Sequence, residues 1–162
     1  NLINKQELSD WIKIIAEFPK EIAREVLSLT DEQLDTPYRD GGWTVRQVVH
    51  HCADSHMNAY CRFKVGLTEE NPTIKPYDEN KWAELHDVQK LPVNISVTIL
   101  HAVHTRLYET LKYVTDDDWN NKTVFHPEHK KTMRLWFLLG MYAWHGKHHV
   151  AHITSLRERK GW

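Results

Sequence analysis

Apolar residues recur at three- and four-residue intervals along four stretches of this 162-residue chain. In the third stretch, for example, Ile95, Ile99, Val103 and Leu107 follow one another at steps of four. This spacing places apolar side chains on one face of a helix, whereas a strand would alternate them at every second residue. No such alternation extends far. The pattern therefore predicts four helices, over residues 5–29, 44–66, 93–114 and 134–160.

Local signals mark where these helices begin and where one is interrupted. Thr44 and Gln47 have the spacing of a capping box, in which each side chain bonds to the backbone N–H of the other residue. Thr30 and Gln33 have the same spacing and predict a short capped turn ahead of the second helix. Pro19 lies inside the first helix, and because it lacks a backbone N–H we expect a kink or a break there.

The segments between the predicted helices differ in length and character. A long polar loop with two prolines, residues 68–82, separates the second helix from the third, and residues 82–85 predict a helical turn. The stretch TVFHPEHKKTM (123–133) predicts a hairpin or an irregular loop before the fourth helix. We therefore expect an all-α fold, a four-helix bundle, in a single domain that spans residues 1–162.

Composition narrows the kind of partner that this protein has. The formal net charge is −1, so the chain carries no overall field that would attract nucleic acid or an anionic membrane. Its longest uncharged apolar stretch, residues 135–144, is too short to cross a bilayer. Cys52 and Cys61, the two cysteines, lie about 13 Å apart along the predicted second helix, too far for a disulfide. These features predict a protein of the reducing cytoplasm that binds neither nucleic acid nor membrane.

Histidine is unusually frequent, with 12 residues, and several gather in the fourth helix. In the stretch AWHGKHHVAH (143–152), His145 and His149 fall in the middle of the apolar face, one helical turn apart. Two imidazoles at this spacing can meet one divalent ion. Each could instead bond to a carbonyl or a carboxylate in the core, but the paired placement favours metal binding. His148 and His152 lie to one side of this face.

A stable metal site needs a third ligand from another helix. The second helix contains the stretch VVHHCADSH (48–56). On a helical wheel His56 lies at the apolar centre, His51 lies about 120° away on the flank, and His50 points further out. Because a helix in a bundle contacts two neighbours, a flank position can also face the central cavity. The spacing leaves both His51 and His56 open as the third ligand.

Three stretches resemble a known family: LDTPYRDGGWTVRQVVHHCADSHMNAYCRFK (34–64), PYDENKW (76–82) and YAWHGKHHVAHI (142–153). They are similar to the YfiT-like branch of the DinB superfamily, four-helix bundles first described as metal-dependent hydrolases and later linked to bacillithiol S-transferase activity. The resemblance implies a homodimer with one divalent transition metal ion, zinc or nickel, held by three histidines. Carried over onto this sequence, the implied ligands are His51, His145 and His149.

Three imidazoles with open coordination positions are typical of a catalytic metal site rather than a structural one. We therefore expect a metal-dependent enzyme in which the ion lowers the pKa of a thiol or of a water. The first alternative is transfer of a low-molecular-weight thiol of the bacillithiol type to an electrophilic substrate, so both small molecules are expected partners. The second is a metal-dependent hydrolase that uses an activated water, and the third is a metal-binding dimer without turnover.

Residues near the implied ligands bear on the choice between the two enzymes. A hydrolase gains from a carboxylate that acts as a general base, and residues 146–148, between the fourth-helix ligands, contain none. This favours thiol transfer, and an approach of Asp54 or Asp78 to the ion would weaken the preference. Asp54, with His148 and His152, is a candidate to orient a ligand imidazole. A solvated carboxylate on the helix surface is the simpler interpretation of Asp54.

Overall fold

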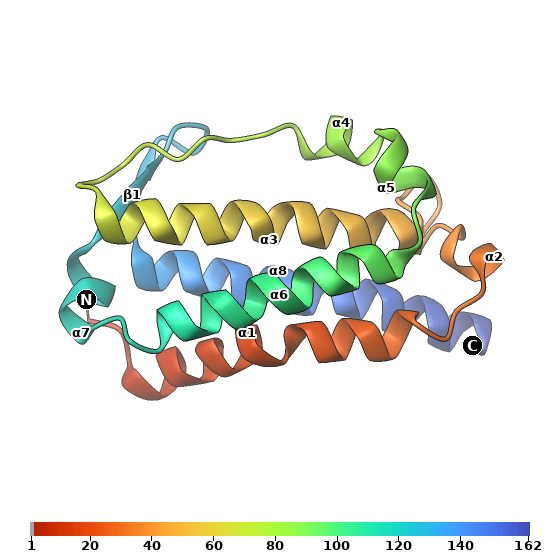
Figure 1. Ribbon diagram of the computed structural model, residues 1–162, viewed down its shortest axis with the longest axis horizontal. Helices are drawn as coiled ribbons and strands as arrows, with labels where there is room; N and C mark the ends of the chain where they lie inside the picture. The colour runs from red at the N-terminus through yellow and green to blue at the C-terminus, as the bar shows by residue number, and fades with distance from the viewer. Residues whose placement is uncertain (1) are drawn as a thin grey trace.

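The computed structural model of the protein describes residues 2–162 and is mainly helical (Figure 1). The helices are α1 (Lys5–Val26), α2 (Asp31–Leu34), α3 (Val45–Thr68), α4 (Glu79–Ala83), α5 (His86–Lys90), α6 (Val93–Leu111), α7 (Asp116–Asn121) and α8 (Leu135–Lys160). Two short strands, β1 (Thr123–His126) and β2 (Lys131–Arg134), form an antiparallel hairpin. The four long helices and the hairpin confirm the sequence prediction. No helix within residues 2–162 has both the length and the apolar character that a membrane span requires.

The long helices α1, α3, α6 and α8 form a four-helix bundle. α1 packs on α6 and α8, and α3 packs on the same two helices, so α1 and α3 occupy opposite corners (Figure 1). α1 and α8 run in one direction along the bundle, and α3 and α6 run in the other. α3 and α6 can be parallel because the segment between them carries the chain back along α3 before α6 begins. That segment contains α4 and α5, two short helices where the sequence predicted one helical turn.

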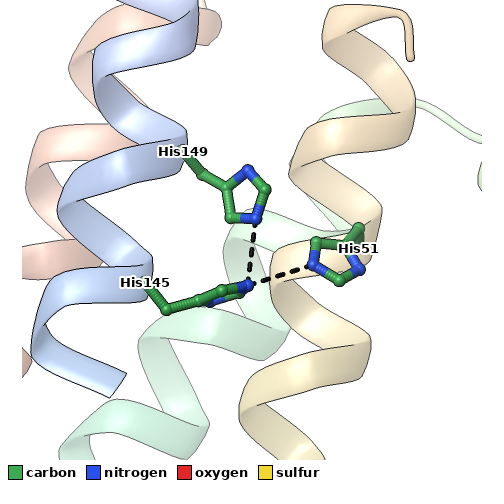
Figure 2. Close-up of side chains that lie close together, drawn as sticks. All are labelled: His51, His145 and His149. Atoms are coloured by element: carbon green, nitrogen blue, oxygen red, sulfur yellow. Dashed lines mark hydrogen bonds between the residues drawn. The ribbon is translucent and has the colours of Figure 1, made fainter. Parts of the chain in front are cut away.

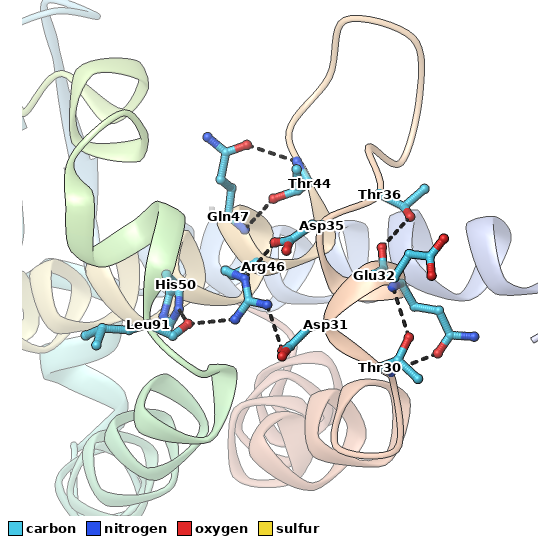
Figure 3. Close-up of polar contacts among 11 residues, drawn as sticks. Thr30, Asp31, Glu32, Asp35, Thr36, Thr44, Arg46, Gln47, His50 and Leu91 are labelled. Atoms are coloured by element: carbon cyan, nitrogen blue, oxygen red, sulfur yellow. Dashed lines mark hydrogen bonds and ion pairs between the residues drawn. The ribbon is translucent and has the colours of Figure 1, made fainter.

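Polar contacts anchor the end of this connection to the start of α3 (Figure 3). Arg46 is buried, and its guanidinium donates to the carboxylates of Asp35 (2.8 Å) and Asp31 (3.1 Å) and to the backbone carbonyl of Leu91 (2.9 Å). A buried guanidinium is stable only when its donors are paired, as they are here. The Arg46 side chain therefore ties α2, α3 and the end of α5 together.

His50 takes part in the same anchor. Its Nε2 donates to the Leu91 carbonyl (2.9 Å), and its Nδ1 accepts from the Ser96 hydroxyl (2.5 Å). The helical wheel pointed His50 away from the apolar centre, yet the residue is buried because α5 and α6 cover that side of α3. The two ring nitrogens of His50 thus hold α3 to the end of α5 and to α6.

The predicted helix starts are confirmed, and of the kink or break expected at Pro19 the structure has no break. Thr44 and Gln47 form a capping box at α3, and Thr30 and Gln33 form one at α2. α1, in contrast, runs unbroken through Pro19. A proline inside a helix leaves one carbonyl without its usual partner, and a residue of α6 supplies that partner here, as described below.

Two apolar clusters fill the bundle, and buried histidines lie where they meet. On α1, Ile15 belongs to one cluster and Ile22 to the other. On α6, the buried His104 lies between Leu100 of one cluster and Leu107 of the other. α3 and α8 also carry buried histidines at this level. The middle of the bundle is therefore a polar layer within an apolar core.

Candidate metal centre

Three imidazoles from two helices face one another in this polar layer (Figure 2). The Nε2 atom of His145 lies 3.2 Å from Nε2 of His51 and 2.9 Å from Nε2 of His149. One ring nitrogen from each of the three lies within 4.8 Å of the others, a grouping that could hold a metal ion. The structure thus brings together the three residues that the family resemblance implied as ligands.

Local packing positions these side chains. His145 and His149 lie one turn apart on α8, and α8 packs against α3, which carries His51. The ring of Trp43 covers His51 at a distance of 4.7 Å between ring centres. Gly146 follows His145 and lets the Phe18 ring of α1 approach the helix, since a Cβ atom there would lie only 2.8 Å from Phe18 Cδ2. Aromatic rings therefore pack against His51 and against α8 beside His145.

The arrangement of nitrogens suits a shared cation better than a set of hydrogen bonds. A neutral imidazole carries one proton on one nitrogen and a lone pair on the other. The single Nε2 of His145 can make one hydrogen bond, yet it lies within bonding distance of two other Nε2 atoms. A divalent ion accepts all three lone pairs at once. The three residues therefore fit a transition metal ion, which imidazole nitrogens bind well.

The electrostatics keep these imidazoles neutral, as metal ligands must be. Burial lowers the pKa of His51 to about 3, and the neighbouring charge of His145 adds to this effect. Burial likewise lowers the pKa of His145 to about 4 and that of His149 to about 2. At neutral pH each ring therefore offers a free lone pair.

The residues expected to orient the ligands lie nearby without bonding to them. The rings of His148 and His152 pack against His149 with ring centres 5.7 and 5.5 Å apart, and His152 stacks on Tyr38. Asp54 is partly buried on α3, and burial, followed by the negative charge of Asp87, raises its pKa to about 6. Within residues 2–162, no hydrogen bond joins Asp54, His148 or His152 to the three facing imidazoles.

His56 lies outside this group but belongs to a second buried pair. Its Nδ1 donates to Nε2 of His104 (2.6 Å), and Nδ1 of His104 donates to the backbone carbonyl of Ile15 (2.6 Å). Because the Ile15 carbonyl can only accept, the proton of His104 must be on Nδ1, which leaves His104 Nε2 as an acceptor. His56 must then carry its own proton on Nδ1 in order to donate to that nitrogen. Nε2 of His56 remains a buried lone pair without a partner among residues 2–162. The group of three facing imidazoles thus contains His51, and His56 lies beside it, 5.7 Å from His145 between ring centres.

Pro19 explains why the Ile15 carbonyl is available. In an α-helix, the N–H of residue 19 would donate to the carbonyl of residue 15, and proline has no N–H. His104 replaces that missing donor. The sequence signal was a proline inside an amphipathic helix, but spacing alone does not show which neighbouring side chain meets the freed carbonyl.

A pocket of about 1040 Å³ reaches the three imidazoles at His145. Residues of α8 and the Trp11 ring of α1 line one part, and residues 76–80 with the β1–β2 hairpin line the rest. Arg62 and Tyr142 also line the pocket, and sequence reasoning missed both as functional candidates. Each belongs to an ordinary helical stretch, so only the path of the loop over α3 shows that they border a cavity.

The fold and the site together define a class of protein: a four-helix bundle with three facing histidines that could hold a metal ion beside a pocket of substrate size. The chain belongs to the DinB superfamily, whose family model matches residues 16–153.

Similar proteins come from the genus Bacillus. The chain is 54% identical over 160 residues to a protein of Bacillus mycoides (strain KBAB4), and 53% identical over 160 residues to one of Bacillus cereus (strain B4264). Each of these is named a "putative metal-dependent hydrolase", and each alignment covers 99% of this chain and 91% of the relative. The structure of YfiT from Bacillus subtilis, described as a probable metal-dependent hydrolase with an unusual four-helix bundle topology, matches with a TM-score of 0.96 and 49% identity. That match covers 99% of this chain and 91% of YfiT.

Proposed function

We propose that the protein is a metal-dependent enzyme whose ion, held by His51, His145 and His149, activates a nucleophile for reaction with a small molecule in the adjoining pocket. The observation that carries this proposal is the convergence of three neutral imidazoles at the edge of a pocket of about 1040 Å³. A structural zinc site is closed by four protein ligands, whereas residues 2–162 offer three here. A divalent ion bound by three imidazoles supplies a Lewis acid that lowers the pKa of a thiol or a water.

The nucleophile that we favour is a low-molecular-weight thiol, and its acceptor is an electrophilic small molecule. In this transfer the thiol sulfur forms a bond to an electrophilic carbon, the leaving group departs with its electron pair, and the thiol proton passes to water. Support comes from the ligand group itself, which contains imidazoles only, and from the lack of a carboxylate at residues 146–148. A thiol needs little help from a general base once its pKa is lowered.

Hydrolysis is the second candidate, and one observation favours it beyond the names of the relatives. Asp78, Glu79 and Glu128 line the same pocket as His145, so carboxylates are available to a bound water. One carboxylate oxygen of Asp78 already accepts a hydrogen bond from the backbone N–H of Lys81 at the start of α4 (3.0 Å).

Metal content tests the site. The protein is purified without a histidine tag, and zinc and nickel are measured in the wild type, His149→Ala, His56→Ala and His101→Ala. We expect about one equivalent of metal in the wild type and a loss of most of it in His149→Ala. His101 is exposed on α6 and serves as the matched control, which keeps its metal. Metal lost from His56→Ala but retained by His149→Ala would assign the site to different ligands.

Turnover then separates the candidate reactions. Metal-loaded protein is mixed with monobromobimane and a panel of thiols that includes bacillithiol, and, in parallel, with ester and amide substrates. Thiol-dependent conversion of the bimane with release of bromide, lost on chelation and in His149→Ala, supports transfer. Thiol-independent cleavage of an ester or amide supports hydrolysis. Bound metal with neither activity would identify a metal-binding protein without turnover and refute both proposals.

A further inference from the structure

We infer that the pocket beside His145 binds an amphipathic small molecule, with a single carboxylate or carbonyl oxygen at Tyr142 and Arg62 and a flat apolar part against α8 and Trp11. The inference rests on the proposed function in treating this molecule as the substrate. The binding itself depends on the pocket alone and can be measured without metal.

The polar end is built from two side chains that support each other. Nη1 of Arg62 donates to the Tyr142 hydroxyl (2.9 Å), and its Nη2 donates to the Lys75 carbonyl (3.1 Å), which together hold the guanidinium in place. The Tyr142 ring is buried and packs near Phe63, with ring centres 6.2 Å apart. Because the Tyr142 hydroxyl oxygen accepts a hydrogen bond from a cation, the O–H group is free to donate to a bound ligand. The same contact polarises the O–H group and makes it a stronger hydrogen-bond donor. An oxygen with negative charge is the best partner for such a donor.

The apolar end is a row of exposed side chains on α8. Phe137, Met141 and Trp144 follow one another at helical spacing, with exposed fractions of 46%, 36% and 64%. All three line the pocket, as does Gly140, where a Cβ atom would lie 2.9 Å from the Trp11 ring. Gly140 thus allows the Trp11 ring to approach the helix closely and extend the row. Small-molecule sites are commonly lined in this way by aromatic and apolar side chains around a few polar groups.

The acidic residues of the pocket restrict the charge of the ligand. Asp78, Glu79 and Glu128 are exposed, so their charges are screened by solvent, and Asp78 also lies 3.8 Å from the ammonium of Lys81. These carboxylates tolerate one negative oxygen at Arg62 and repel a molecule with several. The ligand class is therefore a monoanion or a neutral carbonyl compound with an apolar ring, and a nucleotide or other polyanion is disfavoured.

Calorimetry with 2-naphthoate tests this inference. This probe has one carboxylate on a flat apolar ring, and it is titrated into metal-free protein and into zinc-loaded protein. Acetate, 2-naphthalenemethanol and ATP are the comparison probes, since they lack the ring, lack the charge, or carry several charges. Two variants remove the two ends of the site, Tyr142→Phe and Phe137→Ala. Two matched controls change exposed residues away from the pocket, Tyr113→Phe and Leu27→Ala. Circular dichroism checks that each variant is folded.

We expect 2-naphthoate to bind metal-free protein more tightly than any comparison probe. Tyr142→Phe should weaken it about tenfold or more, and Phe137→Ala about three- to tenfold, with both controls within about twofold of the wild type. Binding that requires zinc and is unchanged in Tyr142→Phe would place the carboxylate on the metal and overturn the inference. So would an absence of binding together with a dimer that Phe137→Ala dissociates in sedimentation, because the apolar row would then join two copies of the chain. Either result leaves the metal-content and turnover tests of the proposed function intact.

Discussion

The link from Pro19 through Ile15 to His104 predicts a specific energetic coupling between two helices. Substitution of His104 by leucine removes the partner of the Ile15 carbonyl and the partner of His56 Nδ1, both buried. Leaving a buried polar group without a hydrogen bond costs about 1–3 kcal/mol, so the loss of both should cost about 2–6 kcal/mol. Substitution of Pro19 by alanine restores the backbone N–H that would donate to Ile15.

A double-mutant cycle isolates this link. In the wild-type background the new N–H meets a carbonyl that His104 already uses, whereas in the His104→Leu background it meets an unpaired one. Pro19→Ala should therefore stabilise the His104→Leu variant by about 1–3 kcal/mol more than it stabilises the wild type. General gains in helix propensity appear in both backgrounds and cancel in the cycle.

The assay is guanidinium unfolding of metal-free protein, followed by circular dichroism, at pH 7.5. A chelator keeps metal binding from adding its own stabilisation. His101→Leu provides the matched background, because His101 is exposed on the same helix, one turn before His104. Coupling with Pro19→Ala should be near zero there. A coupling energy under about 0.5 kcal/mol in the His104 cycle, or an equal value in the His101 cycle, would refute the assignment of His104 as the partner of Ile15.

Two further predictions follow from the same layer. The folded-state pKa values of His51, His145 and His149, at about 3, 4 and 2, lie below the ordinary 6.5, so the unfolded chain binds protons that the folded protein does not. The free energy of unfolding of the metal-free protein should be highest above pH 6.5. At lower pH it should decrease by up to about 1.4 kcal/mol per pH unit for each histidine. Equal urea midpoints at pH 7.5 and 5.5 would contradict this. Gly146→Ala should cost about 1–3 kcal/mol, because its Cβ would lie 2.8 Å from Phe18 Cδ2. A thermal melt beside Lys147→Ala, which alters an exposed neighbour, checks that cost.

The sequence was sufficient for the helices and for the pair of facing imidazoles on one of them. Periodic apolar residues and capping boxes are local signals, so they located α1, α3, α6 and α8 and the start of α3 at Thr44. The spacing of His145 and His149 is also local, since a single helix sets the direction of both side chains. Helix ends were predicted less accurately: α6 ends at Leu111, before the predicted position 114, because Lys112 to Val114 turn toward α7.

The third imidazole and the pocket depend on which helices pack against one another. A helical wheel ranks His56 above His51 because it measures direction from the apolar centre of one helix. In the bundle, that centre faces α6 and α1, where His56 meets His104 and Phe18, and the flank faces α8, where His51 meets His145. The family resemblance selected His51 because members of a family share the same helix packing, and that packing decides which side of α3 faces α8. The pocket could not be predicted in the same way, since Arg62 and Tyr142 border a cavity only after the loop over α3 is in place.

The contacts of the ring nitrogens distinguish two histidines that maintain the fold from the group of three facing imidazoles. Both ring nitrogens of His50 and both of His104 have partners, so these residues join helices as any buried polar group must. In contrast, Nδ1 of His145 and Nδ1 of His149 are buried without a partner among residues 2–162, and their Nε2 atoms crowd one another. A fold alone gains nothing from burying imidazoles in this state, because each unmet bond costs free energy that an apolar side chain would not. The buried histidines therefore have two physical roles: His50 and His104 join helices, and the crowded Nε2 atoms of the three facing imidazoles are the ones that a bound metal ion would stabilise.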